Sequence, residues 1–121
     1  MSKILFVEDD YFIREDVCEM ITGWGYEILA ASDVAEALVV LESLQQIELL
    51  ITDIALKTAR YGGYDISRLA TEQRPSLRVL YTSGTARNQS HIDQAVRGSL
   101  FIQKPYREES LRIAIDTLLA T

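Results

Sequence analysis

Five short apolar segments alternate with five longer amphipathic segments along the chain, and this alternation is what most constrains its fold. Each apolar segment has strand length, and the residues after it repeat with the spacing of one helix face. Strands that are apolar at nearly every position are typical of a parallel sheet covered by helices on both faces. The strands are predicted at Ile4–Val7, Tyr26–Ala30, Leu49–Thr52, Leu77–Tyr81 and Ser99–Ile102.

The amphipathic segments predict the helices that connect these strands. The sequence "GWG" at 23–25 ends the first of them, and Ser32 and Asp33 can cap the second. Because crossovers between parallel strands are right-handed, the pattern predicts an α/β fold with a doubly wound, five-stranded parallel sheet in one domain, residues 1–121. The helices are predicted at Tyr11–Thr22, 33 to about 45, Tyr64–Gln73, Asn88–Val96 and Arg107–Leu119.

Charge and composition exclude several classes of partner. The 12 basic and 18 acidic residues leave a net charge of −6, which disfavours direct binding to nucleic acid or to an anionic membrane. No apolar run is long enough to span a bilayer, and the N-terminus does not have the pattern of a signal peptide. The single cysteine, Cys18, fits a reducing compartment, so a cytoplasmic location is expected.

Chemically active side chains follow four of the predicted strands. In doubly wound sheets, ligands bind beyond the carboxyl ends of the strands, where these side chains would meet. Carboxylates within a few ångströms repel each other by about 4 kcal/mol per pair at an effective dielectric constant near 20. The acids therefore predict an oxygen-ligated hard cation, best matched by Mg²⁺. The strand-end residues are Glu8, Asp9, Asp10, Asp53, Ser83 and Lys104.

Each of these residues also has an ordinary structural interpretation. Asp10 can simply cap the first helix, Glu8 and Lys104 can be solvated, and Ser83 can be a turn residue before Gly84. Considered together, the acids, the hydroxyl and the lysine predict a site for a metal ion and a phosphoryl group. Asp53 is the well-placed nucleophile in that site.

The ordered set of motifs resembles the receiver domain of bacterial two-component response regulators. The resemblance covers roughly residues 3 to 119 and implies a flavodoxin-like sheet with strand order 2-1-3-4-5. The residues that carry it are Glu8-Asp9-Asp10 after "ILFV", Asp53 after "LLIT", Ser83-Gly84 after "VLYT" and Lys104-Pro105-Tyr106 after "FIQ".

The resemblance implies a role for each matching residue. Asp53 would be the phosphoacceptor, converted to 4-aspartylphosphate in a reaction that depends on Mg²⁺. Asp9, Asp53 and the main-chain carbonyl of Ala55 would bind the ion directly, and Glu8 would bind it through water. Lys104 would pair with the phosphoryl oxygens, Ser83 would hydrogen-bond one of them, and the Lys104-Pro105 peptide bond would be cis.

The resemblance also implies partners and a switch. The phosphoryl donor would be a sensor histidine kinase or a histidine phosphotransfer protein. Ser83 and Phe101 would respond to phosphorylation by changing the face formed by the fourth helix, fifth strand and fifth helix, about residues 88 to 119. That face would bind a downstream protein or a fused output domain, or would form a homodimer. The domain would be a phosphoacceptor that phosphorylates and dephosphorylates itself, not an enzyme acting on other substrates.

The chain departs from the family pattern after Asp53. Lys57, Thr58 and Ala59 stand where many relatives carry Pro or Gly, and the segment to Gly63 is interpreted as a mobile loop, with a partner-specific surface as the alternative. Ala55 and Thr85 occupy positions that influence loss of the phosphoryl group to water in the family. Phe101 lacks the hydroxyl of the tyrosine that some relatives use in the switch.

Three alternative functions are weighed against this one. A haloacid dehalogenase-type phosphatase needs a second Asp where this chain has Ala55, and a flavodoxin-like cofactor site would not carry the acidic loop "EDDYF". A receiver-fold interaction module that is never phosphorylated is the remaining alternative, although the intact set of site residues disfavours it. The chain can be a single-domain regulator or the receiver part of a larger protein.

Overall fold

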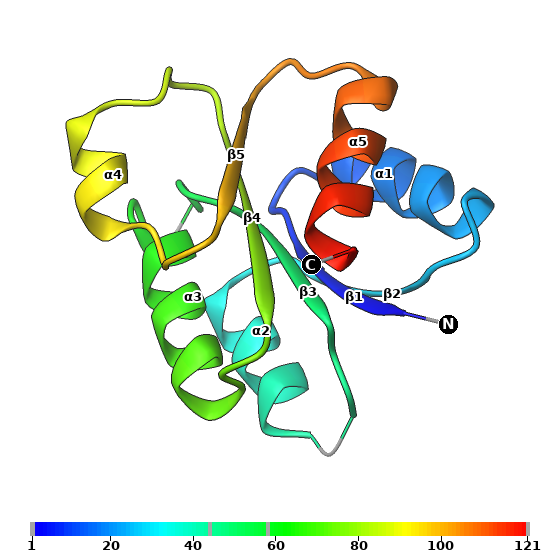
Figure 1. Ribbon diagram of the computed structural model, residues 1–121, viewed down its shortest axis with the longest axis horizontal. Helices are drawn as coiled ribbons and strands as arrows, with labels where there is room; N and C mark the ends of the chain where they lie inside the picture. Colours follow the sequence, from blue (N-terminus) through cyan, green and yellow to red (C-terminus); the bar gives the residue numbers. More distant parts are fainter. Residues whose placement is uncertain (1, 44, 58, 121) are drawn as a thin grey trace.

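The computed structural model describes residues 2–43, 45–57 and 59–120, so Leu44 and Thr58 of the predicted second helix and loop, and the two terminal residues, lie outside the description. Strands and helices alternate strictly along the chain (Figure 1). The elements are β1 (Lys3–Val7), α1 (Tyr11–Gly23), β2 (Glu27–Ala31), α2 (Val34–Glu42), β3 (Leu49–Asp53), α3 (Gly62–Gln73), β4 (Arg78–Ser83), α4 (Gln89–Gln94), β5 (Leu100–Gln103) and α5 (Glu108–Leu119).

The five strands form one parallel sheet in the order β2-β1-β3-β4-β5. The predicted doubly wound sheet and its strand order are therefore confirmed. The central strands are apolar because both of their faces are covered, and every residue of β3 is buried. In the register of the sheet, Asp53 at the end of β3 lies beside Thr82 of β4, so the two strands end at the same edge.

Helices cover both faces of the sheet and divide the core in two. Helices α1 and α5 pack on one face, and α2 and α3 pack on the other, with α4 beside α3 (Figure 1). Alternate residues of each strand contribute to the two clusters, as the period of a β-strand requires. In β3, for example, Leu50 faces the α2 and α3 side and Ile51 faces the α1 and α5 side.

Side-chain caps begin three of the helices. Asp10 accepts a hydrogen bond from the main-chain N of Ile13 at 3.0 Å, and Asp33 and Asn88 accept equivalent bonds at the starts of α2 and α4. Each cap satisfies one of the main-chain N–H groups that a helix leaves unpaired. The capping role that the sequence allowed for Asp10 is thus confirmed.

Two helices, α2 and α4, end earlier than predicted. Helix α2 ends at Glu42, before the predicted boundary near Gln45, because Ser43 has an extended backbone and its hydroxyl donates to the Val40 carbonyl at 2.5 Å. Helix α4 covers only Gln89–Gln94, because Ala95 is also extended. Within the described residues, no helix is both long and apolar enough to cross a membrane.

Candidate functional site

The carboxyl ends of β1, β3, β4 and β5 meet at one edge of the sheet, where most of the predicted site residues lie. Parallel strands all deliver their last residues to the same edge, so side chains distant in the sequence become neighbours. The structure brings four of the predicted side chains into one cluster and places a fifth on the adjoining turn. The four are Glu8, Asp9, Asp53 and Lys104, and the fifth is Ser83.

Lys104 joins two strands of this edge through its ammonium group. Its Nζ donates to Glu8 Oε1 at 2.6 Å and to Asp53 Oδ2 at 2.8 Å. Its main-chain N donates to the Ser83 carbonyl at 2.7 Å, which fixes the end of β5 to the end of β4. The Lys104-Pro105 peptide bond is cis. The side chain is only 20% exposed, so Lys104 is a component of the site and the interpretation of it as a solvated lysine is wrong.

Three carboxylates crowd the same point. Glu8, Asp9 and Asp53 each offer an oxygen atom, and these atoms lie within 4.8 Å of one another. Glu8 is only 1% exposed, so the interpretation of it as a solvated acid is wrong; it is buried because its oxygens face Lys104 and the main-chain N of Asp10. Three acids share a single described lysine, so the cluster has more acidic than basic groups. An all-oxygen donor set of this kind fits a hard divalent cation.

Burial controls the ionisation of the two inner acids. Burial raises the pKa of Glu8 and of Asp53 above their ordinary values, although the contacts with Lys104 act in the opposite direction. The negative charge of Asp9 adds to the increase in the pKa of Asp53. Burial works against the charge of Lys104, but its hydrogen bonds to Asp53 and Glu8 raise its pKa overall. A bound cation would oppose the increase in both carboxyl pKa values.

Main-chain N–H groups of the segment after β3 hold the two aspartates. The main-chain N of Lys57 donates to Asp9 Oδ2 at 2.6 Å, and the main-chain N–H of Ala55 acts against the increase in the pKa of Asp53. Sequence reasoning missed the contact with Lys57, because a main-chain donor does not depend on residue type and leaves no sequence signal. The segment that departs from the family pattern therefore orients an acid of the site.

Ser83 lies at the edge of the cluster without joining it. Its hydroxyl oxygen accepts from the main-chain N of Thr85 at 3.0 Å, as in the predicted turn. It also lines a cavity of about 210 Å³ together with Ala55, Thr85 and Phe101. Phe101 is half-buried and also lines this cavity, so the predicted switch residues Ser83 and Phe101 border the same space.

Two glycines after β3 have a packing role. A Cβ atom on Gly63 would lie 2.3 Å from the Asp53 carbonyl oxygen and 2.7 Å from the Ile54 Cα. A Cβ atom on Gly62 would lie 2.9 Å from the Ala59 Cβ. The interpretation of these residues as part of a mobile loop is wrong, because both are buried at the start of α3. Glycine at 63 lets α3 begin directly against the backbone of the phosphoacceptor candidate.

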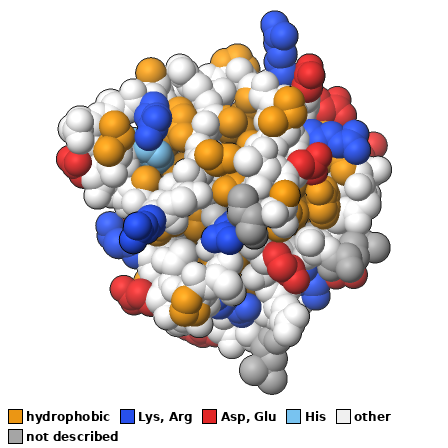
Figure 2. All heavy atoms as spheres, in the orientation of Figure 1, with side chains coloured by type: hydrophobic (Ala, Val, Ile, Leu, Met, Phe, Trp, Pro, Cys, Tyr) orange, Lys and Arg blue, Asp and Glu red, His pale blue; other side chains and the backbone are white. Residues whose placement is uncertain are grey.

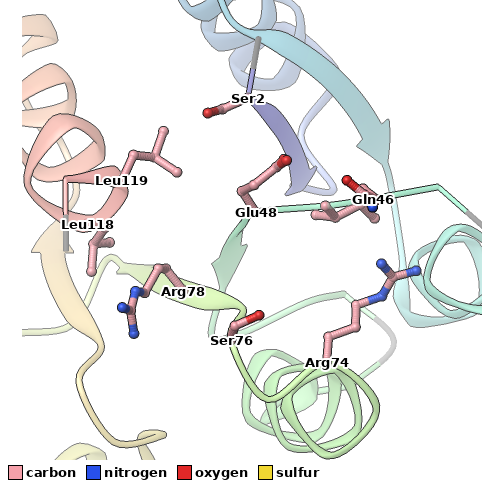
Figure 3. Close-up of a pocket in the computed structure, with 9 residues that line it drawn as sticks. Ser2, Gln46, Glu48, Arg74, Ser76, Arg78, Leu118 and Leu119 are labelled. Atoms are coloured by element: carbon pink, nitrogen blue, oxygen red, sulfur yellow. The ribbon is translucent and has the colours of Figure 1, made fainter.

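A separate cavity of about 570 Å³ lies at the opposite, amino edge of the sheet (Figure 3). Its lining includes Glu48, Arg74 and Arg78, whose side chains come from β3, α3 and β4 or from the residues beside them. None of the strand-end residues predicted for the phosphoryl site lines this cavity. The acidic cluster and this cavity are therefore distinct features of the two ends of the sheet.

Comparison with known proteins agrees with this geometry. The sequence matches the family described as "Response regulator receiver domain" over residues 4–116. The response regulator receiver protein CpdR of Brucella abortus is 30% identical over 122 residues, which cover 98% of each chain. The transcriptional regulatory protein PdtaR of Mycobacterium tuberculosis is 27% identical over 94% of this chain and 55% of that protein, so the chain spans about half of PdtaR.

Solved structures give the same result for the fold. A response regulator receiver protein from Sinorhizobium medicae superimposes with a TM-score of 0.91 at 28% identity, covering 99% of this chain and 95% of that one. The receiver domain of the hybrid histidine kinase CckA superimposes with a TM-score of 0.81 at 28% identity, covering 98% and 99%. The similarity therefore includes every strand that delivers a residue to the acidic edge.

Proposed function

The chain belongs to the response regulator receiver domain family of two-component systems, and we propose that Asp53 accepts a phosphoryl group from a phosphohistidine. One observation carries the proposal: the buried Asp53 carboxylate ends β3 within reach of two further acids and is held by Lys104 at 2.8 Å. In the transfer, an Asp53 oxygen forms a bond to phosphorus while the P–N bond of the phosphohistidine breaks. The imidazole nitrogen keeps the electron pair of that bond.

Mg²⁺ is the proposed cofactor of this transfer. The donor set fits the ion, because three carboxylate oxygens lie within 4.8 Å of one another and, among the described residues, only Lys104 forms ion pairs with them. Asp9, Asp53 and the main-chain carbonyl of Ala55 would hold the ion directly, and Glu8 would hold it through water. When bound, the ion offsets the negative charge that the phosphoryl oxygens bring to the carboxylates.

Lys104 and Ser83 are proposed to bind the phosphoryl group after transfer. The new group carries about −1.5 to −2 charges and adds acceptor oxygens. The Lys104 ammonium already contacts Asp53 and can follow the added charge, and the Ser83 hydroxyl is buried at the same edge. Movement of Ser83 toward the phosphoryl group would leave more of the shared cavity free for the Phe101 ring. This coupled movement of Ser83 and Phe101 is the proposed switch.

The output surface is proposed to be the face of α4, β5 and α5. Figure 2 shows hydrophobic side chains gathered over this face, with charged side chains around them. Each of the three elements carries an exposed apolar residue: Ile92, Leu100 and Ile113. An apolar surface with a charged rim suits a protein partner, which would be a downstream target, a fused output domain or a second copy of the chain.

The remaining features of the proposal follow from the family. The phosphoryl donor would be a sensor histidine kinase or a histidine phosphotransfer protein in the cytoplasm. Residues 1–121 would act as one receiver domain, a phosphoacceptor that binds neither nucleic acid nor membrane directly. The alternative, an interaction module that is never phosphorylated, would leave the crowded acids of the carboxyl edge without a ligand.

Incubation with a small phosphodonor and Mg²⁺, followed by intact mass measurement, tests this function. We expect a mass gain of one phosphoryl group that disappears in Asp53→Asn and on chelation of Mg²⁺. Asp65→Asn, at an exposed acid of α3, is the matched control and should retain the gain. Absence of modification, under conditions that modify an established receiver domain, would favour the interaction module. A gain that persists in Asp53→Asn would move the acceptor elsewhere.

A further inference from the structure

The single histidine of the chain, His91, is buried on α4 and bonded to a tyrosine of α3. His91 is only 4% exposed, and its Nδ1 lies 2.8 Å from the Tyr64 hydroxyl oxygen. Burial and the nearby Arg87 lower the pKa of His91, so the imidazole is neutral near pH 7. We assign the hydroxyl as the donor and Nδ1 as the acceptor.

Aromatic rings from three elements surround this imidazole. The ring centres of Tyr81 on β4 and Phe101 on β5 lie 5.1 Å and 4.8 Å from that of His91, both edge-on. The ring of Tyr64 on α3 lies 5.7 Å away. Such ring pairs stabilise the packing beyond the area they bury. Three arginines line cavities together with His91: Arg87 before α4, Arg97 after α4 and Arg60 before α3. Of these, Arg87 lowers the pKa of His91.

A second group of hydrogen bonds holds the other end of α4. The Tyr81 hydroxyl accepts from the main-chain N of Val96 at 3.0 Å and lies 2.6 Å from the Ser67 hydroxyl. The Ser67 hydroxyl in turn donates to the Tyr64 carbonyl at 3.0 Å. Helix α4 has only six residues, so these side-chain bonds, rather than its own backbone, determine its position.

His91 also borders the cavity that the two predicted switch residues share. The cavity of about 210 Å³ next to Ser83 is lined by Tyr64, His91 and Phe101. The Phe101 ring now packs against the His91 ring, and both rings border this cavity. Phe101 therefore cannot change its position in this space without changing its contact with His91, which α4 carries.

We propose that the Tyr64–His91 hydrogen bond is a latch that fastens α4 to α3 in the unphosphorylated protein and opposes the switch to the phosphorylated conformation. Tyr64 and His91 are thus positioning residues for the reaction at Asp53. This inference rests on the proposed function. It adds a residue pair that influences the equilibrium between the unphosphorylated and phosphorylated conformations. A hydrogen bond that forms only in the unphosphorylated conformation favours that conformation by the free energy of the bond. Loss of the bond should therefore favour binding of a phosphoryl group at Asp53 to the same extent.

Tyr64→Phe tests the latch, because it removes the hydroxyl and keeps the ring. We expect two changes in this variant, each about fivefold, which corresponds to about 1 kcal/mol for one hydrogen bond. The amide of Ala95, which donates to the His91 carbonyl at 2.8 Å, should exchange faster with solvent. Beryllofluoride, a mimic of the phosphoryl group, should bind more tightly in the presence of Mg²⁺, as measured by NMR titration.

Two further sets of variants separate the latch from general destabilisation. Tyr26→Phe is the matched control, because its hydroxyl donates to Asp116 Oδ1 at 2.6 Å on the α5 side of the sheet. It should change neither measurement. His91→Phe should reproduce the effects of Tyr64→Phe, and the double variant should add little to either single variant, as expected for two partners of one bond.

The outcomes distinguish the latch from the proposed function. Unchanged or weaker beryllofluoride binding in Tyr64→Phe, an equal gain in Tyr26→Phe, or full additivity in the double variant would each overturn the latch. A wild-type protein that binds no beryllofluoride would instead contradict the proposed function. The exchange rate of the Ala95 amide in Tyr64→Phe would then still decide whether the bond fastens α4 to α3.

Discussion

The two edges of the β-sheet both carry charged side chains, but they satisfy those charges differently. At the amino edge, Arg74 donates to the carbonyls of Leu41, Ser43 and Gln45, where α2 ends, at 3.0, 3.1 and 2.7 Å. At the carboxyl edge, three carboxylates lie within 4.8 Å of one another and one lysine bridges two of them. At the amino edge, the protein itself supplies the hydrogen-bond partners of Arg74. At the carboxyl edge, the acids outnumber the lysine that pairs with them.

This difference shows how to tell a structural charge from a functional one. Main-chain carbonyls at the end of a helix carry a partial negative charge that suits an arginine, so Arg74 improves the stability of the fold. Crowded acids reduce stability unless a cation joins them, and such a cost is typical of sites that await a ligand. Removing an acid from the carboxyl edge should therefore raise stability, whereas removing Arg74 from the amino edge should lower it.

The largest expected effect is that of Lys104→Met at the carboxyl edge. Loss of the ammonium leaves the buried Glu8 and Asp53 unpaired, and breaking a buried ion pair in this way lowers the free energy of unfolding by about 3 kcal/mol. Urea denaturation without divalent cations measures the loss. Lys3→Met is the matched control, because Lys3 pairs with the exposed Glu27 at 3.6 Å and should contribute less than about 1 kcal/mol. Equal losses would contradict the distinction between the edges.

Arg74→Met should have the next largest effect, and only on stability. The variant keeps the aliphatic stem but removes the hydrogen bonds to the carbonyls that end α2, which should lower the free energy of unfolding by about 2 kcal/mol. Phosphoryl uptake at the other edge should be unchanged. Arg78→Met is the control, because among the described residues the Arg78 side chain has no hydrogen-bond or ion-pair partner. A loss of uptake in Arg74→Met would show that the edges are coupled.

Asp53→Asn should have a smaller effect of the opposite sign. Removing one charge from the acidic cluster should raise the free energy of unfolding by about 1 kcal/mol at pH 7 without divalent cations. Glu48→Gln at the amino edge should not stabilise, because the Glu48 carboxylate accepts from the main-chain N of Lys3 at 2.7 Å. Thermal or urea unfolding of both variants makes this comparison. If Asp53→Asn is less stable than the wild type, the ion pair with Lys104 outweighs the repulsion between Asp53 and the other two acids.

The smallest expected effect is the pH dependence of the stability that Asp53→Asn gains over the wild type. The pKa of Asp53 is raised from its ordinary 3.8, mainly by burial, so the folded protein binds this proton more readily than the unfolded chain. Ionisation of Asp53 therefore lowers stability as the pH rises above 3.8, until the pH exceeds the raised pKa. The advantage of Asp53→Asn over the wild type should grow across this interval and then level off. If the stability advantage of Asp53→Asn instead shrinks as the pH rises, the pKa of Asp53 is lowered and not raised in the folded protein.

Sequence reasoning predicted the fold well because its signals are local. Periodicity and length identify strands and helices, and the parallel sheet then requires that Asp9, Asp53, Ser83 and Lys104 end at one edge. The errors concern residues whose roles depend on distant neighbours. Glycine at 63 resembles any loop glycine until the backbone of Asp53 lies against it, and the carbonyls at the end of α2 are bound by Arg74 from the end of α3.

The sequence by itself determined the order of the elements and the edge where the chemistry belongs, because both follow from short-range patterns and from the geometry of parallel strands. Only the tertiary structure decided the contacts between residues far apart in the chain. The bond between Lys104 and Glu8, the donation from Lys57 to Asp9 and the burial of His91 against Tyr64 are of this kind. Each depends on distances and burial that packing alone creates, and residue type does not encode them.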